Sequence, residues 1–419
     1  MKRKWTILYI ILFFCICTIP TAGYLIKGAE GDFEENFGFR KELITANSQI
    51  LAKIFQTSSD DGVIVGEQGW LYYKDSLEDY QGMKNMSERQ LFDAAHTLSM
   101  IQEYVESKGL AFAFAIAPNK NSLYGEDMPY YYRGFREQEN NRVRLIPYLE
   151  AEGIHYADLY EEFSKQDKVL YHKQDSHWNN EGAALAADSI LSCLDKEHSS
   201  YSNAKTYIEK DFEGDLAAML YPAAIPKENE IYYEKKPDFT YIQEVESNFD
   251  PKIYTESAKG KGSLVMYRDS FGNALLPFMA EAYEQAYFSR AVPYQLSDIF
   301  SCHADTLVIE RAERFIPELA ENAPVMPAPI ENGRLWDDGI FTEEIQDLEV
   351  VNQGVYTKIK GTIPNELLEV KSRILIRVNG LVSYEAFPVC ADGQEEFECY
   401  LITKTLKEDN TFELGIVSE

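Results

Sequence analysis

Short apolar runs of strand length alternate with helical patterns through most of this chain of 419 residues. The runs lie at residues 110–117, 263–267 and 306–310. Helical patterns separate them, including one that opens with the capping-box sequence Ser87-Glu88-Arg89-Gln90 and one that begins at Asn179. Strands that alternate with helices are typical of a mainly parallel sheet, so we predict an α/β layer fold.

The N-terminal residues 5–26 contain no charged side chain, and about 20 apolar residues suffice to cross a bilayer. Lys2, Arg3 and Lys4 precede this segment, which favours a cytoplasmic N-terminus and an exported body. We therefore predict a single-pass signal anchor in the cell membrane with the body on the extracytoplasmic side. A cleaved signal peptide is the main alternative, although Thr21-Ala22-Gly23 makes a poor cleavage site. A buried helix of the globular fold is the third.

The formal net charge is −29. Binding to nucleic acid requires a basic surface that neutralises phosphates, so this class of partner is excluded. The same charge disfavours docking of the body onto an anionic membrane surface. The sequence has six cysteines but no Cys-x-x-Cys or His-rich spacing, and we predict neither a metal site nor a cofactor. Cys390 and Cys399 flank a turn-rich stretch, and either a hairpin disulfide or two free thiols fits that position.

Composition also changes along the chain. A proline-rich stretch follows the α/β pattern, and strand patterns such as residues 356–361 and 374–380 come after it. Residues 199–262 are polar and without periodicity, which suggests an excursion from the core. We predict four parts: a cytoplasmic tip and anchor over residues 1–30, a main α/β domain over 31–322 that opens with a juxtamembrane helix over 31–50, a linker over 323–335, and a small all-β sandwich over 336–419.

Three residues offer chemistry for acyl transfer. Asp175 and His177 are two positions apart, so in an extended segment both side chains lie on one side. Ser270 follows an apolar strand and precedes a helix, a position that exposes the hydroxyl beside the positive end of the helix. A serine nucleophile needs a base, and the base needs an acid that holds its tautomer. The alternatives are a helix cap at Asp269 or Ser270, and a surface histidine. His172 has no acid at the same spacing, so we expect a structural role.

The stretch Asp175-Ser176-His177-Trp178-Asn179, together with the later Arg268-Asp269-Ser270-Phe271, resembles the SGNH-hydrolase-like domain of the alginate O-acetyltransferases and related DHHW proteins. Other stretches are similar to that family over roughly residues 31–320: Phe39-Arg40, residues 63–73, Ala117-Pro118-Asn119-Lys120 followed by Tyr124, Gly214-Asp215-Leu216, and residues 305–314. The resemblance implies an SGNH-like three-layer fold for the main domain.

The resemblance also implies roles for individual residues. Ser270 is expected to be the nucleophile, His177 the general base, and Asp175 the residue that orients the imidazole. Ser176 stands where the family often has Thr or His, and we expect it to face away from the chemistry. The Ser270 N–H is an expected oxyanion donor. Further candidates for substrate or oxyanion binding are Arg268, Asn119, Lys120 and Trp178.

These observations lead to one functional prediction with two rivals. We predict a membrane-anchored O-acetyltransferase that modifies a cell-surface or secreted polysaccharide, and the resemblance implies a membrane-bound O-acyltransferase partner as the acetyl donor. A carbohydrate acetylesterase could use the same three residues with water as the acceptor. A non-catalytic surface protein that binds or assembles polysaccharide could keep the fold without turnover. The distances among Ser270, His177 and Asp175 distinguish the last rival from the other two.

Overall fold

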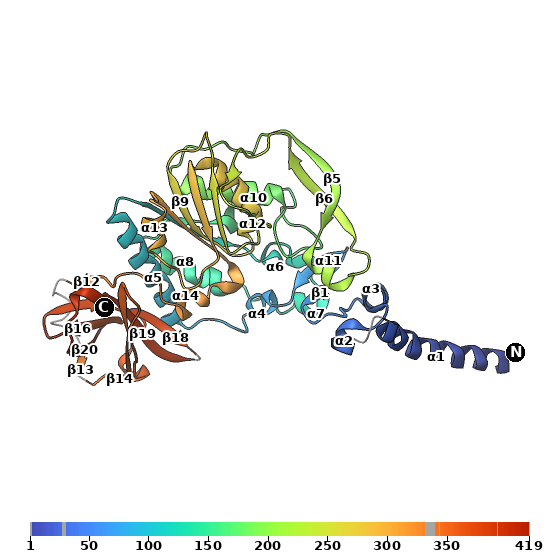
Figure 1. Cartoon of the computed structure of the whole chain (residues 1–419), viewed down its shortest axis with the longest axis horizontal. Helices are drawn as coiled ribbons and strands as arrows, with labels where there is room; N and C mark the ends of the chain where they lie inside the picture. The colour runs from blue at the N-terminus through green and yellow to red at the C-terminus, as the bar shows by residue number, and fades with distance from the viewer. Residues whose placement is uncertain (1, 27–30, 332–339, 343, 392, 419) are drawn as a thin grey trace.

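The computed structural model describes residues 2–26, 31–331, 340–342, 344–391 and 393–418. Figure 1 shows a central α/β body, an N-terminal helix that projects from one end, and the C-terminal strands at the other end. Residues 27–30 of the predicted anchor region lie outside the described residues, as do residues 332–339, which cover the end of the predicted linker and the start of the predicted sandwich.

Within the described residues, a seven-stranded mixed sheet forms the centre of the body. In spatial order its strands are β4 (Tyr156–Ala157), β3 (Ala111–Ala117), β11 (Thr306–Ala312), β9 (Ser263–Tyr267), β10 (Gln285–Ser289), β8 (Lys252–Glu256) and β7 (Thr240–Tyr241). The first five strands run parallel, as predicted, and β8 and β7 add antiparallel pairs at one edge. The stretch expected to be an excursion from the core therefore contributes two strands to the sheet.

Helices cover both faces of this sheet. Side chains alternate across the pleat, so each strand supplies two apolar cores. Ala113, Leu264 and Val308 belong to one core, and Phe112, Val265 and Leu307 to the other. The first face carries α9 (Leu159–Ser164), α10 (Asn180–Cys193) and α12 (Gly272–Ala282), and the second carries α5 (Glu88–Glu106), α8 (Asn141–Ala151), α13 (Asp298–Ser301) and α14 (Glu318–Glu321). These three layers confirm the predicted α/β fold.

Local sequence signals set the ends of two of these helices. Ser87 and Gln90 form the predicted capping box at the start of α5, which satisfies backbone N–H groups that have no partner inside the helix. The Asn179 side chain accepts a hydrogen bond from the Gly182 N–H and caps α10. Both predicted starts are confirmed.

Smaller elements surround the carboxyl ends of the parallel strands. They are the hairpin of β1 (Val63–Val65) and β2 (Leu71–Tyr73), the hairpin of β5 (Thr206–Glu213) and β6 (Lys227–Tyr233), and the short helices α4 (Ser76–Tyr80), α6 (Lys120–Leu123), α7 (Tyr130–Arg133) and α11 (Asp215–Leu220). In the sequence, α6 directly follows the parallel strand β3. The β5–β6 hairpin and α11 lie in the insertion between α10 and β8.

The N-terminal helix α1 (Lys2–Ile26) is a candidate membrane span. The most apolar 18 residues within residues 5–26 have a mean hydropathy of 2.1, and none of them is buried against the rest of the protein. The alternative of a buried core helix is therefore wrong. Length and composition fit both an anchor and a signal sequence. After it come α2 (Phe33–Asn36), α3 (Arg40–Ile50) and the π-helical turn η1 (Leu51–Phe55), in the region predicted as a juxtamembrane helix.

The C-terminal region consists mainly of strands in two sheets. One has the order β12 (Ile330–Glu331), β17 (Val382–Glu385), β16 (Arg373–Val378), β20 (Phe412–Val417) and β13 (Ile340–Thr342), and the other has the order β14 (Gln346–Asn352), β15 (Tyr356–Thr362), β19 (Gln394–Ile402) and β18 (Phe387–Ala391). Ile359 and Phe397 of the second sheet pack with Ile374 and Ile416 of the first in one core.

Two details differ from the sequence analysis. The strand β12 lies inside the predicted linker, because the extended chain after the prolines pairs with β17. Cys390 and Cys399 are both free thiols. They are buried at different levels of the β18–β19 ladder, where Cys390 pairs with Glu395, so the disulfide alternative is wrong.

His96 ties the C-terminal sheets to the α/β body. On α5, its Nδ1 lies 2.9 Å from Glu152 of α8, and its Nε2 lies 2.8 Å from Glu385 of β17. Arg373 forms a second ion pair with Glu385. Burial by itself lowers the pKa of His96, but the hydrogen bonds that its imidazole donates to both carboxylates outweigh burial and raise the pKa to about 9. A charged imidazole therefore bridges the two parts near neutral pH.

Candidate active site

Ser270 lies at the carboxyl end of the central strand β9 and just before α12. Asp269 shapes this turn, because its Oδ1 accepts from the Phe271 N–H at 2.9 Å and its Oδ2 from the Ala312 N–H at 2.6 Å. A Cβ at position 272 would lie 2.4 Å from the Arg268 side chain, so only glycine fits there. Asp269 therefore holds the turn in place and leaves the Ser270 hydroxyl available.

Asp175 and His177 lie in a bent loop rather than in an extended segment. Asp175 Oδ1 accepts from the backbone N–H of His177 at 2.8 Å, which is the geometry of a side-chain-closed turn. This turn brings the two side chains together, whereas we had expected strand alternation to do so. The Lys120 ammonium stabilises this loop by donating hydrogen bonds to the carbonyl oxygens of His172, Lys173 and Asp175.

A continuous chain of hydrogen bonds joins the three predicted residues. His177 Nε2 lies 2.8 Å from Ser270 Oγ, and His177 Nδ1 lies 2.8 Å from Asp175 Oδ1. Burial tends to raise the pKa of Asp175, but the hydrogen bond and charge of His177 outweigh this and hold the pKa well below its usual range. Asp175 is thus a carboxylate at neutral pH and can keep the Nδ1 proton of the imidazole in place.

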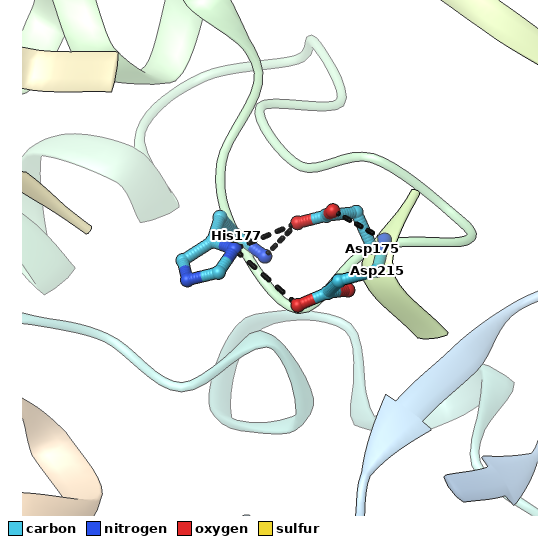
Figure 2. Close-up of side chains that lie close together, drawn as sticks. All are labelled: Asp175, His177 and Asp215. Carbon is cyan, nitrogen blue, oxygen red and sulfur yellow. Dashed lines mark hydrogen bonds and ion pairs between the residues drawn. The ribbon is translucent and has the colours of Figure 1, made fainter. Parts of the chain in front are cut away.

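A second carboxylate, Asp215, lies at the same imidazole (Figure 2). Its Oδ2 lies 3.6 Å from His177 Nδ1 and accepts from Ser176 Oγ at 2.5 Å. Ser176 Oγ in turn lies 3.2 Å from His177 Nδ1. The expectation that Ser176 faces away from the chemistry is therefore wrong, because the turn at Asp175 points its hydroxyl toward the imidazole.

Asp215 also positions Asp175 through its backbone, since its N–H donates to Asp175 Oδ2 at 2.8 Å. A Cβ at Gly214 would lie 2.2 Å from the carbonyl oxygen of Gln174, so this approach requires glycine. Burial, followed by the charge of Asp175, raises the pKa of Asp215. Gly214-Asp215-Leu216 is one of the stretches similar to the SGNH-hydrolase-like family, and that similarity was the available signal for Asp215 in the sequence.

Asp175, His177 and Asp215 also bring their ligand atoms within 4.8 Å of one another, a spacing that could hold a metal ion. Hydrogen bonds already engage these atoms, however. Both imidazole nitrogens have partners, and both Asp175 oxygens accept N–H groups. The donor set fits a hydrogen-bonded proton-transfer site better than a metal site.

In the comparison with protein families, residues 63–252 match the family described as "SGNH hydrolase-like domain, acetyltransferase AlgX". The matched part contains Asp175, His177 and Asp215 and ends before Ser270. The chain thus carries an SGNH-like acyltransferase domain. The comparison with curated proteins found no match.

Among solved structures, a DHHW family protein from Eubacterium siraeum matches with 16% identity and a TM-score of 0.48, over 64% of this chain and 98% of that one. PatB1 from Bacillus cereus matches with 14% identity and a TM-score of 0.48, over 61% and 96%. AlgX from Pseudomonas aeruginosa matches with 12% identity and a TM-score of 0.40, over 89% and 97%.

Four further residues that were predicted to bind substrate or the oxyanion are buried structural residues of the SGNH-like domain. Arg268 donates to the carbonyl oxygens of Asn248 and Asp250 and to Asn273. Asn119 donates to Asp79. The terminal guanidinium nitrogens of Arg268 and the amide nitrogen of Asn119 donate to protein groups, because the loops around the site need internal partners for their backbone. The substrate or oxyanion contacts of Arg268 and Asn119 stay predictions.

Lys120 and Trp178, the other two residues predicted to bind substrate or the oxyanion, are also buried. The Lys120 ammonium is buried beneath the Asp175 loop, and burial lowers its pKa to about 8. The Trp178 ring packs on Phe271 and Phe163 and is 1% exposed. His172, which we expected to be structural, is buried, with Nε2 3.0 Å from Glu230 and its ring stacked on Phe212.

A cavity of about 800 Å³ lies near the site, and its lining includes Lys74, Tyr132 and Arg314. Arg314 connects the cavity with the imidazole. Its guanidinium lies 5.5 Å from the centre of the Phe271 ring, and that ring lies 4.9 Å from the ring of His177. Arg314 was noted in the sequence as part of a family-like stretch, but only the fold places it here.

Proposed function

We propose that this protein is a membrane-anchored, extracytoplasmic O-acetyltransferase that acetylates a polysaccharide through Ser270, His177 and Asp175. The observation that carries the proposal is the unbroken hydrogen-bond chain from Ser270 Oγ through His177 to Asp175. It occurs in a domain that matches an acetyltransferase family over residues 63–252. The short distances argue against a surface protein that keeps the fold without turnover.

In the first step, Ser270 Oγ attacks the carbonyl carbon of an acetyl ester while His177 Nε2 takes the hydroxyl proton. The donor alcohol leaves with that proton, and the acetyl group stays on Ser270. Asp175 holds the Nδ1 proton of His177 and balances the charge of the imidazolium. The Ser270 N–H is the expected donor to the oxyanion, and the positive end of α12 beside it adds to the stabilisation.

In the second step, a sugar hydroxyl attacks the acetyl group of Ser270. His177 takes the proton of this hydroxyl, and the proton then returns to Ser270 Oγ as the acetyl group leaves. The cavity near Arg314 and Tyr132 has room for more than one sugar ring. We propose it as the acceptor site. A membrane-bound O-acyltransferase is the proposed donor partner, and α1 would keep the body next to it.

The test uses the full chain in lipid nanodiscs with p-nitrophenyl acetate as the donor. Mass spectrometry after rapid quenching should find one acetyl group on the peptide that contains Ser270. A mixture of oligosaccharides added during turnover should then gain acetyl groups at the expense of free acetate. Acetate as the sole product with every acceptor would support the esterase instead, and no acetyl-enzyme with an intact fold would contradict the assignment of Ser270.

A further inference from the structure

The segment that follows α1 has an unusual distribution of polar and apolar side chains. Thr45 and Ser48 of α3 are buried, whereas Leu43, Ile50 and Ile54 are exposed and recur at helical spacing. Phe39 and Phe55, at the two ends of this stretch, are exposed as well. A helix beside water normally places its apolar side chains toward the protein. Here the two fully buried side chains are polar, beside the half-buried Ile44 and Leu51, and a row of apolar side chains faces outward.

Both buried polar residues have partners in the protein. Thr45 Oγ1 accepts from the Ala223 N–H at 3.0 Å, and Ser48 Oγ lies 2.5 Å from Ser59 Oγ. These contacts fix the rotation of α3 about its axis. The apolar stripe is therefore directed away from the body by specific hydrogen bonds.

The position of the segment indicates what the stripe faces. Residues 5–26 of α1 are long enough to span the roughly 30 Å hydrocarbon core at 1.5 Å per residue. The chain then folds back beside the end of this helix, where the Gly38 N–H donates to the Pro20 carbonyl oxygen at 3.0 Å. Tyr24 and Phe33 pack edge to face with ring centres 5.1 Å apart. Aromatic residues gather at the level where a span leaves the bilayer.

We propose that the juxtamembrane segment, residues 33–55, lies in the interface of the lipid bilayer with Phe39, Leu43, Ile50, Ile54 and Phe55 inserted among the lipids. Amphipathic helices of this kind bury their apolar face about 5–10 Å into the boundary between head groups and acyl chains. Apolar insertion requires no attraction to anionic lipid, so it is compatible with the acidic body. This proposal rests on the membrane anchoring given under Proposed function.

The consequence concerns the orientation of the active site. Ala223, which donates to Thr45, follows α11 by three positions, and the first residue of α11 is Asp215 at the imidazole. Figure 1 shows α3 close to α11 and far from α13, on the opposite side of the body. An inserted segment would thus hold the α11 side of the body toward the membrane at a fixed distance, where an acetyl group from a lipid-embedded donor could reach it.

The test uses the full chain in nanodiscs of phosphatidylcholine, with photoreactive benzoylphenylalanine in place of one phenylalanine at a time. Three exposed positions form a matched set: Phe13 in α1 (63% exposed), Phe55 in the segment (62%) and Phe300 in α13 (50%). After irradiation, mass spectrometry measures lipid adducts. We expect the yield at Phe55 to be within a factor of about two of that at Phe13 and about tenfold above that at Phe300.

Each other outcome overturns a defined part of the proposal. Adducts at Phe13 with a Phe55 yield no higher than at Phe300 would leave the anchor intact and refute the interfacial segment. A covalent dimer at Phe55 without lipid adducts would mean that a second copy covers the stripe. No adducts at Phe13 would refute membrane anchoring itself. Acetyl transfer by each variant, measured separately, shows whether the proposed catalytic function holds independently of these results.

Discussion

The backbone N–H of Asp215 donates to the carboxylate of Asp175 over 2.8 Å, across 40 positions of sequence. This bond is the third that Asp175 accepts, since its other oxygen receives both the backbone and the side-chain N–H of His177. Asp175 is therefore held rigidly between α11 and the loop that carries the imidazole. The orientation of His177 depends on two segments of the chain.

Replacing the proposed nucleophile or its orienting acid should abolish or strongly reduce activity without unfolding the protein. Ser270→Ala removes one oxygen and should eliminate acetylation of the enzyme. In Asp175→Asn, the side chain no longer keeps the proton on Nδ1 of His177, so the imidazole can adopt the wrong tautomer. This change should lower kcat by about 10⁴-fold. Rates with p-nitrophenyl acetate and circular dichroism spectra measure the two effects. Unchanged turnover in Ser270→Ala would contradict the mechanism.

The Asp215 side chain should contribute to the catalytic rate through its contacts with Ser176 and the imidazole of His177, in addition to the contribution of its backbone N–H. Asp215→Ala keeps the backbone N–H but removes the acceptor of Ser176 and the charge 3.6 Å from His177 Nδ1. The loss of one hydrogen bond to a charged group predicts a decrease in kcat of roughly 10- to 100-fold. Asp211→Ala, which affects an exposed carboxylate bonded to Tyr232, is the matched control and should keep full activity.

Glu310 on β11 should keep its proton to a higher pH than an ordinary glutamate. It is completely buried, and burial, followed by the charge of Asp269, raises its pKa well above the usual range. Glu310→Gln preserves the acceptor for the Asp269 N–H and should change the free energy of unfolding by less than about 1 kcal/mol. Glu310→Ala leaves a cavity and an unpaired N–H, and should cost about 2–4 kcal/mol. Urea unfolding of both variants measures the difference.

The link between the C-terminal sheets and the α/β body should weaken in alkaline solution. The pKa of His96 is raised from 6.5 to about 9 in the folded protein. Its stabilising effect is therefore complete below about pH 6.5 and disappears as the pH rises through about 9, with an upper limit of about 3 kcal/mol. The difference in Tm between the wild type and His96→Gln should shrink over this range. His155→Gln, at a histidine whose side chain is 56% exposed, is the matched control substitution.

The anchor should affect the acetylation of polysaccharide in cells but not the chemical steps at the active site. Deletion of residues 1–27, with export restored by a cleavable signal, should leave hydrolysis of p-nitrophenyl acetate unchanged. Acetylation of surface polysaccharide should decrease, because the body loses its high effective concentration near a membrane-embedded donor. Polysaccharide from cells that produce each form can be assayed for ester-linked acetate. Full acetylation by the released form would remove the role proposed for α1.

The sequence alone was sufficient for the elements whose signals are local. The capping box at Ser87 and the N-cap at Asn179 depend on hydrogen bonds within one turn of helix, so both could be predicted. The apolar runs predicted three strands of the parallel sheet, with bounds that differ from those of β3, β9 and β11 by at most two residues. Asp175, His177 and Ser270 could be chosen because acyl transfer requires those residue types at the end of a strand and beside one another.

Tertiary structure decided everything that depends on contacts between distant segments. Whether Arg268, Lys120 and Trp178 meet solvent or protein is set by loops that pack over them, and no local pattern records this burial. Asp215 reaches the imidazole because an insertion folds back onto the Asp175 loop, where Gly214 permits the approach. The rotation of α3 follows from its bond to Ala223. Residue types therefore determined the available chemistry, and non-local packing determined which residues take part in it.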